Sequence, residues 1–328
     1  MPVAGKGTRL RPHTHLTPKP LLRVGDKPVL SYILDDLREL GVNEAVLITG
    51  HLKDKVEAYM KSEYPDFHAE YTEQVEQRGT ADAIRLAEPF VQEEMLIIFV
   101  DTLFDADLSL VRRLPDEVAG VIWAKEVEDY QRFGVLVTDE NGFMREIIEK
   151  PSEPVSKLAN IGLYYIRDWR LLFEGIRHVM SQPPSSSGEY YLTDAFQYMV
   201  DKGAKLKVEP VNGWYDAGKP ETLLETNAHV LGGARSRPPR QLGEGVTVHE
   251  PVHVADGVTL EHSVIGPNVT LGAGTTVRGS TLRDTIVGDN TSIVDSRLND
   301  SLLGNDVKVH GVTGQVDLGD HSVVVVAG

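Results

Sequence analysis

The sequence predicts an α/β layer fold with a mostly parallel sheet, followed by a short parallel β-helix. Helix-like and strand-like segments alternate over residues 27–104, which implies parallel strands joined by crossover helices. After a stretch rich in glycine, arginine and proline at 232–240, apolar residues recur about every six positions, which is typical of a β-helix. We therefore expect a first domain over 1–231, a linker over 232–240 and a β-helix over 241–328.

The alternation begins at residues 29–40, whose apolar side chains follow helical spacing up to a helix stop at Gly41. Short apolar runs bounded by turn residues are expected as buried strands. The segments that follow are a strand at 45–48, a helix at 53–61, a strand at 68–72, a helix at 80–87 and a strand at 95–100. In such sheets ligands bind at the carboxyl ends of the strands, and Asp101 falls at one of these ends.

The C-terminal part of the chain repeats an apolar residue at intervals of six, with an occasional five, and glycine often follows it. Three short strands would form each coil and would point one such residue inward. The predicted triplets are Val248, Val254 and Leu260; Ile265, Leu271 and Val277; Leu282, Val287 and Ile293; and Leu298, Leu303 and Val309. They predict about four coils, and residues 323–326 could pair with a partner chain as an edge strand.

Composition narrows the classes of function. The net charge of −16 at pH 7 argues against general affinity for nucleic acid, which needs a cationic surface, but permits an anionic small molecule bound by a local cluster of cations. The absence of cysteine excludes disulfides, thiol nucleophiles and cysteine-ligated metals. Because no apolar run resembles a signal peptide or a membrane span, we expect a cytoplasmic protein with no membrane partner.

The opening segment Gly5-Lys6-Gly7-Thr8-Arg9 combines two glycines, two cations and a hydroxyl. Glycines let backbone amides face an anion and the cations supply countercharge, so the segment is a candidate phosphate cradle; a solvated basic turn is the other interpretation. It matches neither the P-loop nor the Gly-x-Gly-x-x-Gly turn. Only Val3 and Ala4 stand where an apolar strand is expected before it. Either this first strand is vestigial or the sequence begins inside the strand of a longer natural chain, and we expect the second.

Two aspartates are candidate metal ligands. Asp101 ends the strand at 95–100, and Asp216 lies in the segment Trp214-Tyr215-Asp216-Ala217-Gly218. Mg²⁺ takes one or two carboxylates together with phosphate oxygens, so the pair would suit phosphate chemistry, although Asp101 could also cap a helix or a turn. His13 and His15 are close in sequence, and we interpret them as polar residues of the opening loop rather than as metal ligands.

Two further segments suit a nucleotide sugar. Gln74 precedes Gly79 and Thr80, which open a helix; its amide offers a donor and an acceptor to a base edge, although Thr80 could simply start the helix. Glu149 and Lys150 end an apolar run. They could form a surface ion pair of little energetic value, or they could bind sugar hydroxyls and a phosphate.

In their order along the chain, these segments resemble the sugar-1-phosphate nucleotidylyltransferases. The family signature Gly-x-Gly-Thr-Arg-Leu-x-Pro, followed by Pro-Lys-Pro-Leu and Lys-Pro, stands here at residues 5–12, 18–21 and 27–28. Further matches are Gly79-Thr80-Ala81, Phe133-Gly134-Val135, Glu149-Lys150-Pro151, Asn160-Ile161-Gly162-Leu163-Tyr164, Gly188-Glu189-Tyr190-Tyr191-Leu192-Thr193-Asp194 and Trp214-x-Asp216-x-Gly218. The resemblance covers residues 1–230 and implies a Rossmann-like nucleotidyltransferase domain. The repeats resemble the left-handed β-helix appended to several members.

The resemblance implies a role for each candidate residue. The residues implied to bind the nucleotide are Ala4, Gly5, Gly7, Thr8, Gln74, Gly79 and Thr80, of which Gln74 and Gly79 would read the base. Those implied to line the sugar pocket are Gly134, Glu149, Lys150, Asn160 and Glu189. Those implied to act in catalysis are Arg9 and Lys19, which would neutralise the triphosphate, and Asp101, which with Asp216 would hold the implied cofactor Mg²⁺.

The implied reaction is in-line attack of a sugar 1-phosphate on the α-phosphorus of a nucleoside triphosphate, with release of pyrophosphate. The position of Gln74 resembles that in glucose-1-phosphate thymidylyltransferases, so dTTP and glucose 1-phosphate are the expected substrates. The alternatives are UTP-dependent glucose- or N-acetylglucosamine-1-phosphate uridylyltransferases and mannose-1-phosphate guanylyltransferases. Val100 and Thr102 flank the metal aspartate here, where the family usually has glycine before it and often asparagine after it.

Two other classes of function stay open. A regulatory homologue would bind a nucleotide sugar without making it, although the implied catalytic residues are all present. A hexapeptide-repeat acyltransferase would use His310 or His321 as a base between subunits. We expect the β-helix to serve the assembly of a homo-oligomer instead.

Overall fold

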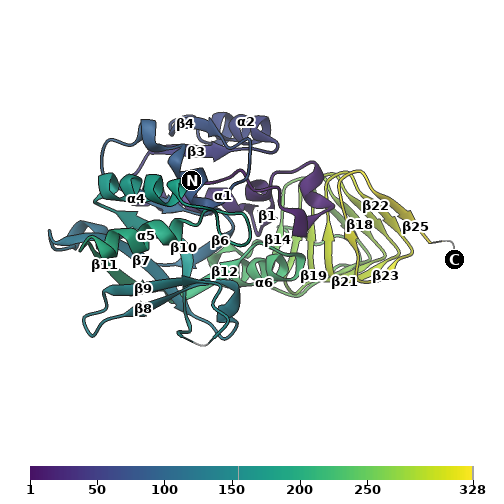
Figure 1. The fold of residues 1–328 in the computed structure, drawn as a ribbon. Coiled ribbons are helices and arrows are strands. Elements are labelled where there is room, and N and C mark those ends of the chain that lie inside the picture. The colour runs from purple at the N-terminus through teal and green to yellow at the C-terminus, as the bar shows by residue number, and fades with distance from the viewer. Residues whose placement is uncertain (154, 327–328) are drawn as a thin grey trace. The chain divides into compact units, whose positions relative to one another are not determined.

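The computed structural model describes residues 1–153 and 155–326, and the chain divides into two compact units (Figure 1). The first comprises Met1–Gly5 and Asp35–Trp214, and the second comprises Lys6–Leu34 and Tyr215–Gly328. Ala327 and Gly328, at the end of the expected β-helix, lie outside the described residues. The opening segment is thus divided after Gly5.

The first unit contains the alternating segments that the sequence predicts. Helix α1 ends in it, and two strand–helix pairs and a further strand follow. These elements are α1 (Val29–Glu39), β3 (Glu44–Thr49), α2 (Lys53–Glu63), β4 (His68–Glu73), α3 (Thr80–Arg85) and β5 (Met95–Ile98). The later elements are β6 (Thr102–Asp105), β7 (Val118–Glu126), β8 (Gly134–Thr138), β9 (Met144–Glu149), β10 (Leu158–Ile166), α4 (Trp169–Ser181), α5 (Leu192–Asp201), β11 (Lys205–Pro210) and the start of β12 (Gly213–Asp216), which ends in the second unit.

Parallel and antiparallel pairs combine in this unit. A six-stranded sheet has the order β11-β7-β10-β8-β9, with β5 also paired to β10. β11 and β7 are parallel, whereas β10 is antiparallel to β5, β7 and β8, and β8 is antiparallel to β9. β3 and β4 form a separate parallel pair. The α/β class is confirmed. A short turn without a crossover helix joins the antiparallel strands β8 and β9, whereas β10 pairs antiparallel with β5 and β7, which are farther away in sequence.

The opening residues form a short strand segment beside β3. Pro2 makes a parallel bridge to Ile48, and the Val3 N–H donates to the Ile48 carbonyl at 2.8 Å. The core of the unit includes Ile122 from β7, Phe173 from α4 and Phe196 from α5, all fully buried. The helices therefore cover the sheet with their apolar sides, as expected of layered packing.

The second unit contains a parallel β-helix. Every strand pair in its two sheets is parallel, and the larger sheet forms two columns of strands that converge on β19 and β21. Its strands are β13 (Thr247–Val248), β14 (Val252–Val254), β15 (Thr259–Glu261), β16 (Val264–Ile265), β17 (Val269–Leu271), β18 (Thr276–Arg278), β19 (Thr281–Val287), β20 (Ser292–Val294), β21 (Arg297–Leu303), β22 (Lys308–His310), β23 (Thr313–Gly314), β24 (Asp317–Leu318) and β25 (Val323–Val325). The predicted triplets form its buried interior.

The β-helix has about five coils rather than about four. The second sheet is five-stranded, in the order β15-β18-β20-β22-β25. In the last coil, Gly314, Leu318 and Val324 pair with Leu298, Leu303 and Val309 of the coil before. Glycine stands at the first position of this triplet, so the apolar repeat does not reveal the fifth coil.

The rest of the second unit consists of the opening segment and one helix. The segment forms three 3-10 helices and a two-stranded hairpin: η1 (Thr8–Leu10), η2 (His13–His15), η3 (Lys19–Leu21), β1 (Arg23–Val24) and β2 (Lys27–Pro28). Helix α6 (Pro220–Val230) leads into the expected linker, where Arg237 pairs with the first coil through hydrogen bonds to Val252 and Val254. No helix in the described part of the chain is long and apolar enough to cross a membrane.

Candidate active site

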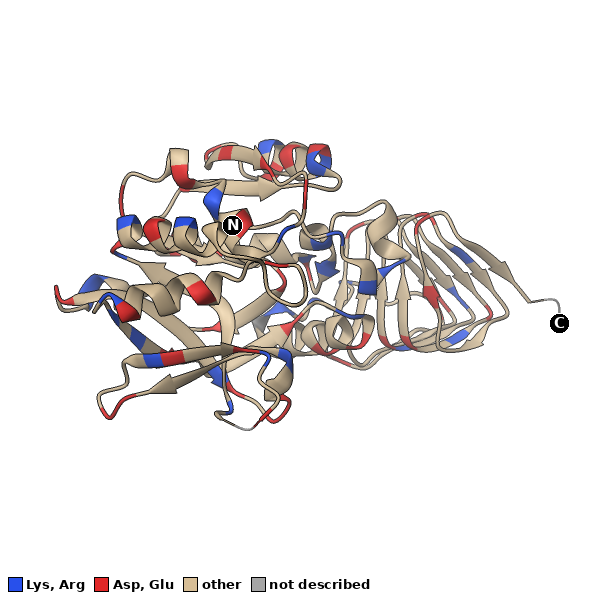
Figure 2. Ribbon diagram, viewed as in Figure 1, with Lys and Arg blue, Asp and Glu red and all other residues tan. Residues whose placement is uncertain are grey.

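The predicted site residues fall in both units. The residues in the first unit are Ala4, Gly5, Gln74, Gly79, Thr80, Asp101, Gly134, Glu149, Lys150, Asn160 and Glu189. The residues in the second unit are Gly7, Thr8, Arg9, Lys19 and Asp216. Acidic residues are spread over the helices and turns of both units (Figure 2), so the cations of the opening segment are a local feature of an acidic chain.

In the second unit, the opening segment is an exposed basic loop with one constrained glycine. Gly7 has a left-handed backbone, with φ of 58°. Its carbonyl accepts a hydrogen bond from the buried Thr14 hydroxyl at 2.8 Å, and a Cβ on Gly7 would lie 2.7 Å from the Thr14 methyl. Glycine is therefore required for both conformation and space. Thr8 and Arg9 are exposed and Lys19 is half-buried, so both cations can reach an anion.

In the first unit, the segment up to Gly5 is fixed by a residue that the sequence analysis missed. The Gln77 amide donates to the Ala4 carbonyl at 2.6 Å. Ala4 is buried and Gly5 is exposed, and a Cβ on Gly5 would meet no atom within 4 Å. Gln77 lies two residues before the motif that begins at Gly79, and this position in the sequence could have indicated that it belongs to the site.

Gln74 is held in one orientation. It is buried, and its Nε2 donates to the Gly79 carbonyl at 3.2 Å and to Asp82 Oδ2 at 3.1 Å. A carboxylate only accepts hydrogen bonds, so Asp82 fixes which end of the amide is the nitrogen. Asp82 in turn accepts from the Arg85 guanidinium at 3.0 Å. The acceptor end of the amide, Oε1, is the end that remains to be offered to a ligand.

Gly79 and Thr80 are connected to a segment more than a hundred residues away in sequence. The Tyr190 N–H donates to the Arg78 carbonyl at 2.8 Å, and the Ala81 N–H donates to the Tyr190 carbonyl at 2.9 Å. The Thr80 hydroxyl accepts from the Leu192 N–H at 2.9 Å. Gly79 has φ of 109°, and a Cβ there would lie 2.4 Å from the Tyr190 carbonyl oxygen. This close backbone approach explains the glycine.

Three of the predicted sugar-binding residues lie together. Gly134 pairs with Glu149 across β8 and β9, and the Asn160 amide on β10 donates to the Gly134 carbonyl at 3.0 Å. A Cβ on Gly134 would lie 2.5 Å from Asn160 Nδ2 and 2.8 Å from Glu149 Oε2, so only glycine leaves room for both side chains. The buried Tyr164 hydroxyl donates to Asn160 Oδ1, which orients that amide.

Glu149 is a largely buried carboxyl with a raised pKa. Burial raises its pKa above the ordinary value of 4.5, and the charge of Lys150 and a hydrogen bond from Thr193 act in the opposite direction. The Thr193 hydroxyl lies 3.3 Å from Glu149 Oε2, and Lys150 Nζ lies 3.8 Å from Oε1. Thr193 and Tyr164 lie in segments that match the family motifs, but the sequence alone did not indicate a role for either residue.

Lys150 and Glu189 make their contacts outside the group formed by Gly134, Glu149 and Asn160. Lys150 is exposed, has a left-handed backbone with φ of 47°, and places its Nζ 5.1 Å from the centre of the Tyr191 ring. Glu189 belongs to a turn in which its N–H donates to the Ser185 hydroxyl at 3.3 Å and its carbonyl accepts from the Ser185 N–H at 3.0 Å.

The two predicted metal ligands lie in different units. Asp101 follows β5, at a carboxyl end of the sheet, and is half-buried. The neighbouring Thr102 hydroxyl is buried, and among the described residues it has no hydrogen-bond partner. In the second unit, the Thr222 hydroxyl donates to Asp216 Oδ2 at 3.1 Å, and Gly218 leaves room for Oδ1.

Each of these aspartates has the chemistry of a magnesium ligand. No group of three or more His, Asp or Glu residues gathers around a common point within the part of the chain that the structure describes. Mg²⁺ is usually held by one or two carboxylates, with phosphate oxygens and water completing its coordination, rather than by a full protein cage. Single carboxylates are therefore suited to a metal that arrives with a phosphate substrate.

The chain is similar in sequence and fold to known proteins. The model of the family described as nucleotidyl transferase matches residues 3–232. The chain is 34% identical to the UTP–glucose-1-phosphate uridylyltransferase AglF of Haloferax volcanii over 70% of this chain and 94% of that protein. It is 31% identical to a glucose-1-phosphate thymidylyltransferase of Streptomyces antibioticus over 94% of this chain and 88% of that protein. A Bacillus anthracis crystal structure, assigned as a glucose-1-phosphate thymidylyltransferase, aligns with a TM-score of 0.60 and 27% identity over 73% of this chain and 96% of that chain.

Proposed function

The chain belongs to the nucleotidyl transferase family, as a sugar-1-phosphate nucleotidyltransferase, and we propose that it makes dTDP-glucose from dTTP and glucose 1-phosphate. The fixed orientation of the Gln74 amide supports a base with a ring N–H, which thymine and uracil share. The thymidylyltransferase relative that matches this chain over 94% of its length supports thymine as that base. UTP is the second candidate, since a uridylyltransferase is also among the relatives.

Gln74 discriminates between bases by offering an acceptor. Its Nε2 is engaged by Asp82 and Gly79, so Oε1 faces the base edge. Thymine and uracil present a ring N–H at position 3, which can donate to Oε1, whereas cytosine presents an acceptor there. Two facing acceptors repel, so CTP is a poorer substrate than dTTP or UTP. Oε1 alone does not separate dTTP from UTP, because both bases present the same edge to it.

The sugar 1-phosphate binds through the cluster around Glu149. The Glu149 carboxylate accepts from sugar hydroxyls, and the Asn160 amide, which Tyr164 orients, contributes a second polar group. Gly134 keeps the space above them open. Lys150 contacts the sugar phosphate, and Glu189 lines the same pocket. A carboxylate and an amide held by their own hydrogen bonds are preorganised for a polyhydroxylated ligand.

The reaction needs alignment and charge neutralisation rather than a general base. The attacking oxygen belongs to a phosphate that is already an anion; it forms a bond to the α-phosphorus, and the bond to the bridging oxygen of pyrophosphate breaks. Arg9 and Lys19, together with the backbone of Ala4, Gly5, Gly7 and Thr8, bind the triphosphate and screen the repulsion between the two polyanions. Mg²⁺, held by Asp101 and Asp216, would supply further neutralisation of phosphate charge.

The nucleotide assignment is tested by replacing Gln74. We expect Gln74→Ala to lower the ratio of kcat/KM for dTTP to that for CTP about 10-fold, since one hydrogen bond to the base is lost, with KM for glucose 1-phosphate little changed. Gln92→Ala, which removes an exposed amide from the same unit, is the control. An equal loss of nucleotide and sugar selectivity in Gln74→Ala would refute the assignment.

Two properties of the whole protein belong to the proposal. The protein acts in the cytoplasm, where nucleoside triphosphates and sugar phosphates are available. It forms a homo-oligomer through the β-helix, since β25 presents Val323 and Val325 to solvent with exposures of 64% and 63%. The preceding strand of the same sheet, β22, instead presents Lys308 and His310 outward. Outward valines beside a free strand edge favour pairing with a second copy.

A further inference from the structure

The opening basic loop, residues 7–21, belongs to the same compact unit as the β-helix. Pro12, in the loop, approaches the last coil so closely that a Cβ on Gly319 would lie 3.0 Å from the Pro12 Cβ. The loop itself consists of three 3-10 helices of three residues each, which cannot be stable alone. Something outside the loop must therefore hold its conformation.

One anchor joins the loop to the last coil. The buried His13 contacts the Asp317 carboxylate of β24 through its Nε2. Thr14, the next residue, donates its hydroxyl to the Gly7 carbonyl at 2.8 Å. The His13–Asp317 contact is thus one residue away from the contact that fixes Gly7.

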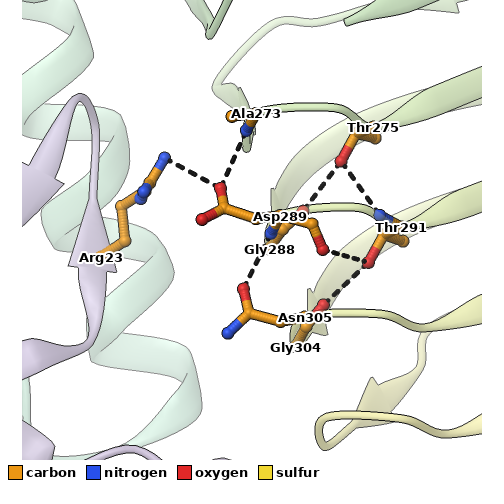
Figure 3. Close-up of polar contacts among 8 residues, drawn as sticks. All are labelled: Arg23, Ala273, Thr275, Gly288, Asp289, Thr291, Gly304 and Asn305. Carbon is orange, nitrogen blue, oxygen red and sulfur yellow. Dashed lines mark hydrogen bonds and ion pairs between the residues drawn. The ribbon is translucent and has the colours of Figure 1, made fainter. Parts of the chain in front are cut away.

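A second anchor joins the loop to an earlier coil. Arg23 follows η3, four residues after Lys19, and its guanidinium lies 3.4 Å from Asp289 Oδ1 (Figure 3). The same oxygen accepts from the Ala273 N–H at 2.8 Å, and the Asp289 N–H donates to Asn305 Oδ1 at 2.8 Å. Asn305 in turn donates its N–H to Asp320 Oδ1 at 2.8 Å. Arg23 therefore contacts a ladder of side chains that connects successive corners of the β-helix.

The hairpin after the loop is held by a third contact. Asn227 of α6 is fully buried, and its Oδ1 accepts from the Gly25 N–H at 2.8 Å and from the Thr270 hydroxyl at 2.7 Å. Its Nδ2 donates to the Asn268 carbonyl at 3.2 Å. One amide thus connects the hairpin, helix α6 and the second coil, which fixes the C-terminal end of the loop.

We propose that the β-helix positions the triphosphate-binding loop, with His13, Asp317, Arg23 and Asp289 as positioning residues for the reaction. Their contacts lie on both sides of Lys19 in sequence, and they hold a segment whose cations Lys6, Arg9 and Arg11 are exposed. A preorganised loop loses less conformational freedom when it binds the triphosphate, so binding is tighter. This role rests on the proposed function of the loop, but the anchors themselves are observable without any substrate.

The test compares Asp317→Ala and Arg23→Met with a matched control on the β-helix. His310 Nε2 lies 3.4 Å from Asp295 Oδ2, which is also a histidine–aspartate pair but joins two β-helix residues, so Asp295→Ala is the control. We expect Asp317→Ala and Arg23→Met each to lower kcat/KM for the nucleoside triphosphate about 10-fold, mainly through KM, since a charge-assisted contact is lost. KM for the sugar 1-phosphate should change little. Asp317→Asn, which keeps an oxygen acceptor, should restore most of the loss.

Hydrogen exchange supplies the readout that does not depend on turnover. In the full chain without substrate, amides of residues 7–21 should exchange faster in Asp317→Ala and Arg23→Met than in the wild type or Asp295→Ala. Unchanged exchange and unchanged triphosphate kinetics in both variants would overturn the proposal. If the wild type released no pyrophosphate with any substrate pair, the proposed function would fail while the exchange data still decided whether the β-helix holds the loop.

Discussion

Glu149 illustrates at the residue scale how a binding group can oppose stability. Its side chain is only 20% exposed, and burial raises its pKa above the ordinary 4.5. Between the unfolded and folded pKa values the folded protein binds more protons than the unfolded chain, so ionisation of Glu149 destabilises the fold as the pH rises through this window. Below 4.5 the carboxyl is protonated in both states and this cost is absent.

We therefore expect Glu149→Gln to raise the Tm by a few degrees at neutral pH and to lose this advantage below pH 4.5. The same variant should lower kcat/KM for the sugar 1-phosphate about 100-fold, because the sugar hydroxyls lose a charged acceptor. Glu146→Gln, an exposed carboxyl on the same strand, should change neither quantity. A Tm difference that did not depend on pH would contradict the burial argument.

Sequence motifs indicated the candidate residues of the site, but they did not indicate the partners of those residues. Gln74 and Gly79 were quoted for base reading, but the contact of Gly79 with Tyr190 depends on backbones that are far apart in sequence. Thr193 was likewise quoted without a role, although its hydroxyl reaches Glu149. Periodicity and spacing reveal local structure, whereas these contacts are made by tertiary packing.

At the scale of elements, the β-helix is stabilised by hydroxyl groups buried at its corners. The Thr291 hydroxyl donates to the Gly304 carbonyl at 2.9 Å and accepts from the Val307 N–H at 3.2 Å. Thr275 makes the same donation one coil earlier, to the Gly288 carbonyl at 2.9 Å (Figure 3). A column of such groups satisfies backbone polar atoms that the coil corners leave without ladder partners.

We expect Thr291→Val to lower the free energy of unfolding by about 1–3 kcal/mol, because it leaves a buried N–H and a buried carbonyl without that partner. Thr281→Val makes the same change at an exposed position of β19 and should cost little. Urea unfolding of both variants measures the difference. If the two substitutions cost the same, the buried hydroxyls do not contribute as argued.

The elements were predicted well where the apolar pattern was regular. The helix at 29–40 and the strands at 45–48 and 68–72 match α1, β3 and β4 closely. The fifth coil was missed because Gly314 occupies an inward position, so the pattern lacks an apolar side chain there. The antiparallel partners of β10 were also not predictable, because strand order is set by long-range pairing.

At the scale of the whole molecule, the proposed oligomer predicts a specific sensitivity. The full chain should show a mass above that of one 36.2 kDa chain in light scattering. Val323→Lys combined with Val325→Lys should lower this mass, because charged side chains on an edge strand prevent pairing with a second copy. Arg297→Lys, on an exposed position of β21, keeps its charge and should leave the mass unchanged. A wild type that runs as a single chain would contradict this assembly.

The sequence did not reveal how the chain divides into compact units. Its composition changes at residues 232–240, yet residues 6–34 group with the β-helix rather than with the sheet that follows them. Neither charge nor periodicity indicates the His13–Asp317 contact, whose partners lie 304 residues apart. The β-helix thus contacts the loop to which the family resemblance assigns the triphosphate.

The central claim is that this chain joins a nucleotide to a sugar 1-phosphate. It is tested most directly by pyrophosphate release from the full chain with Mg²⁺, crossing dTTP, UTP, GTP, ATP and CTP with glucose, N-acetylglucosamine and mannose 1-phosphates. We expect the highest kcat/KM for dTTP with glucose 1-phosphate, the next highest for UTP, and the lowest for CTP. Folded protein that releases no pyrophosphate with any pair would contradict it.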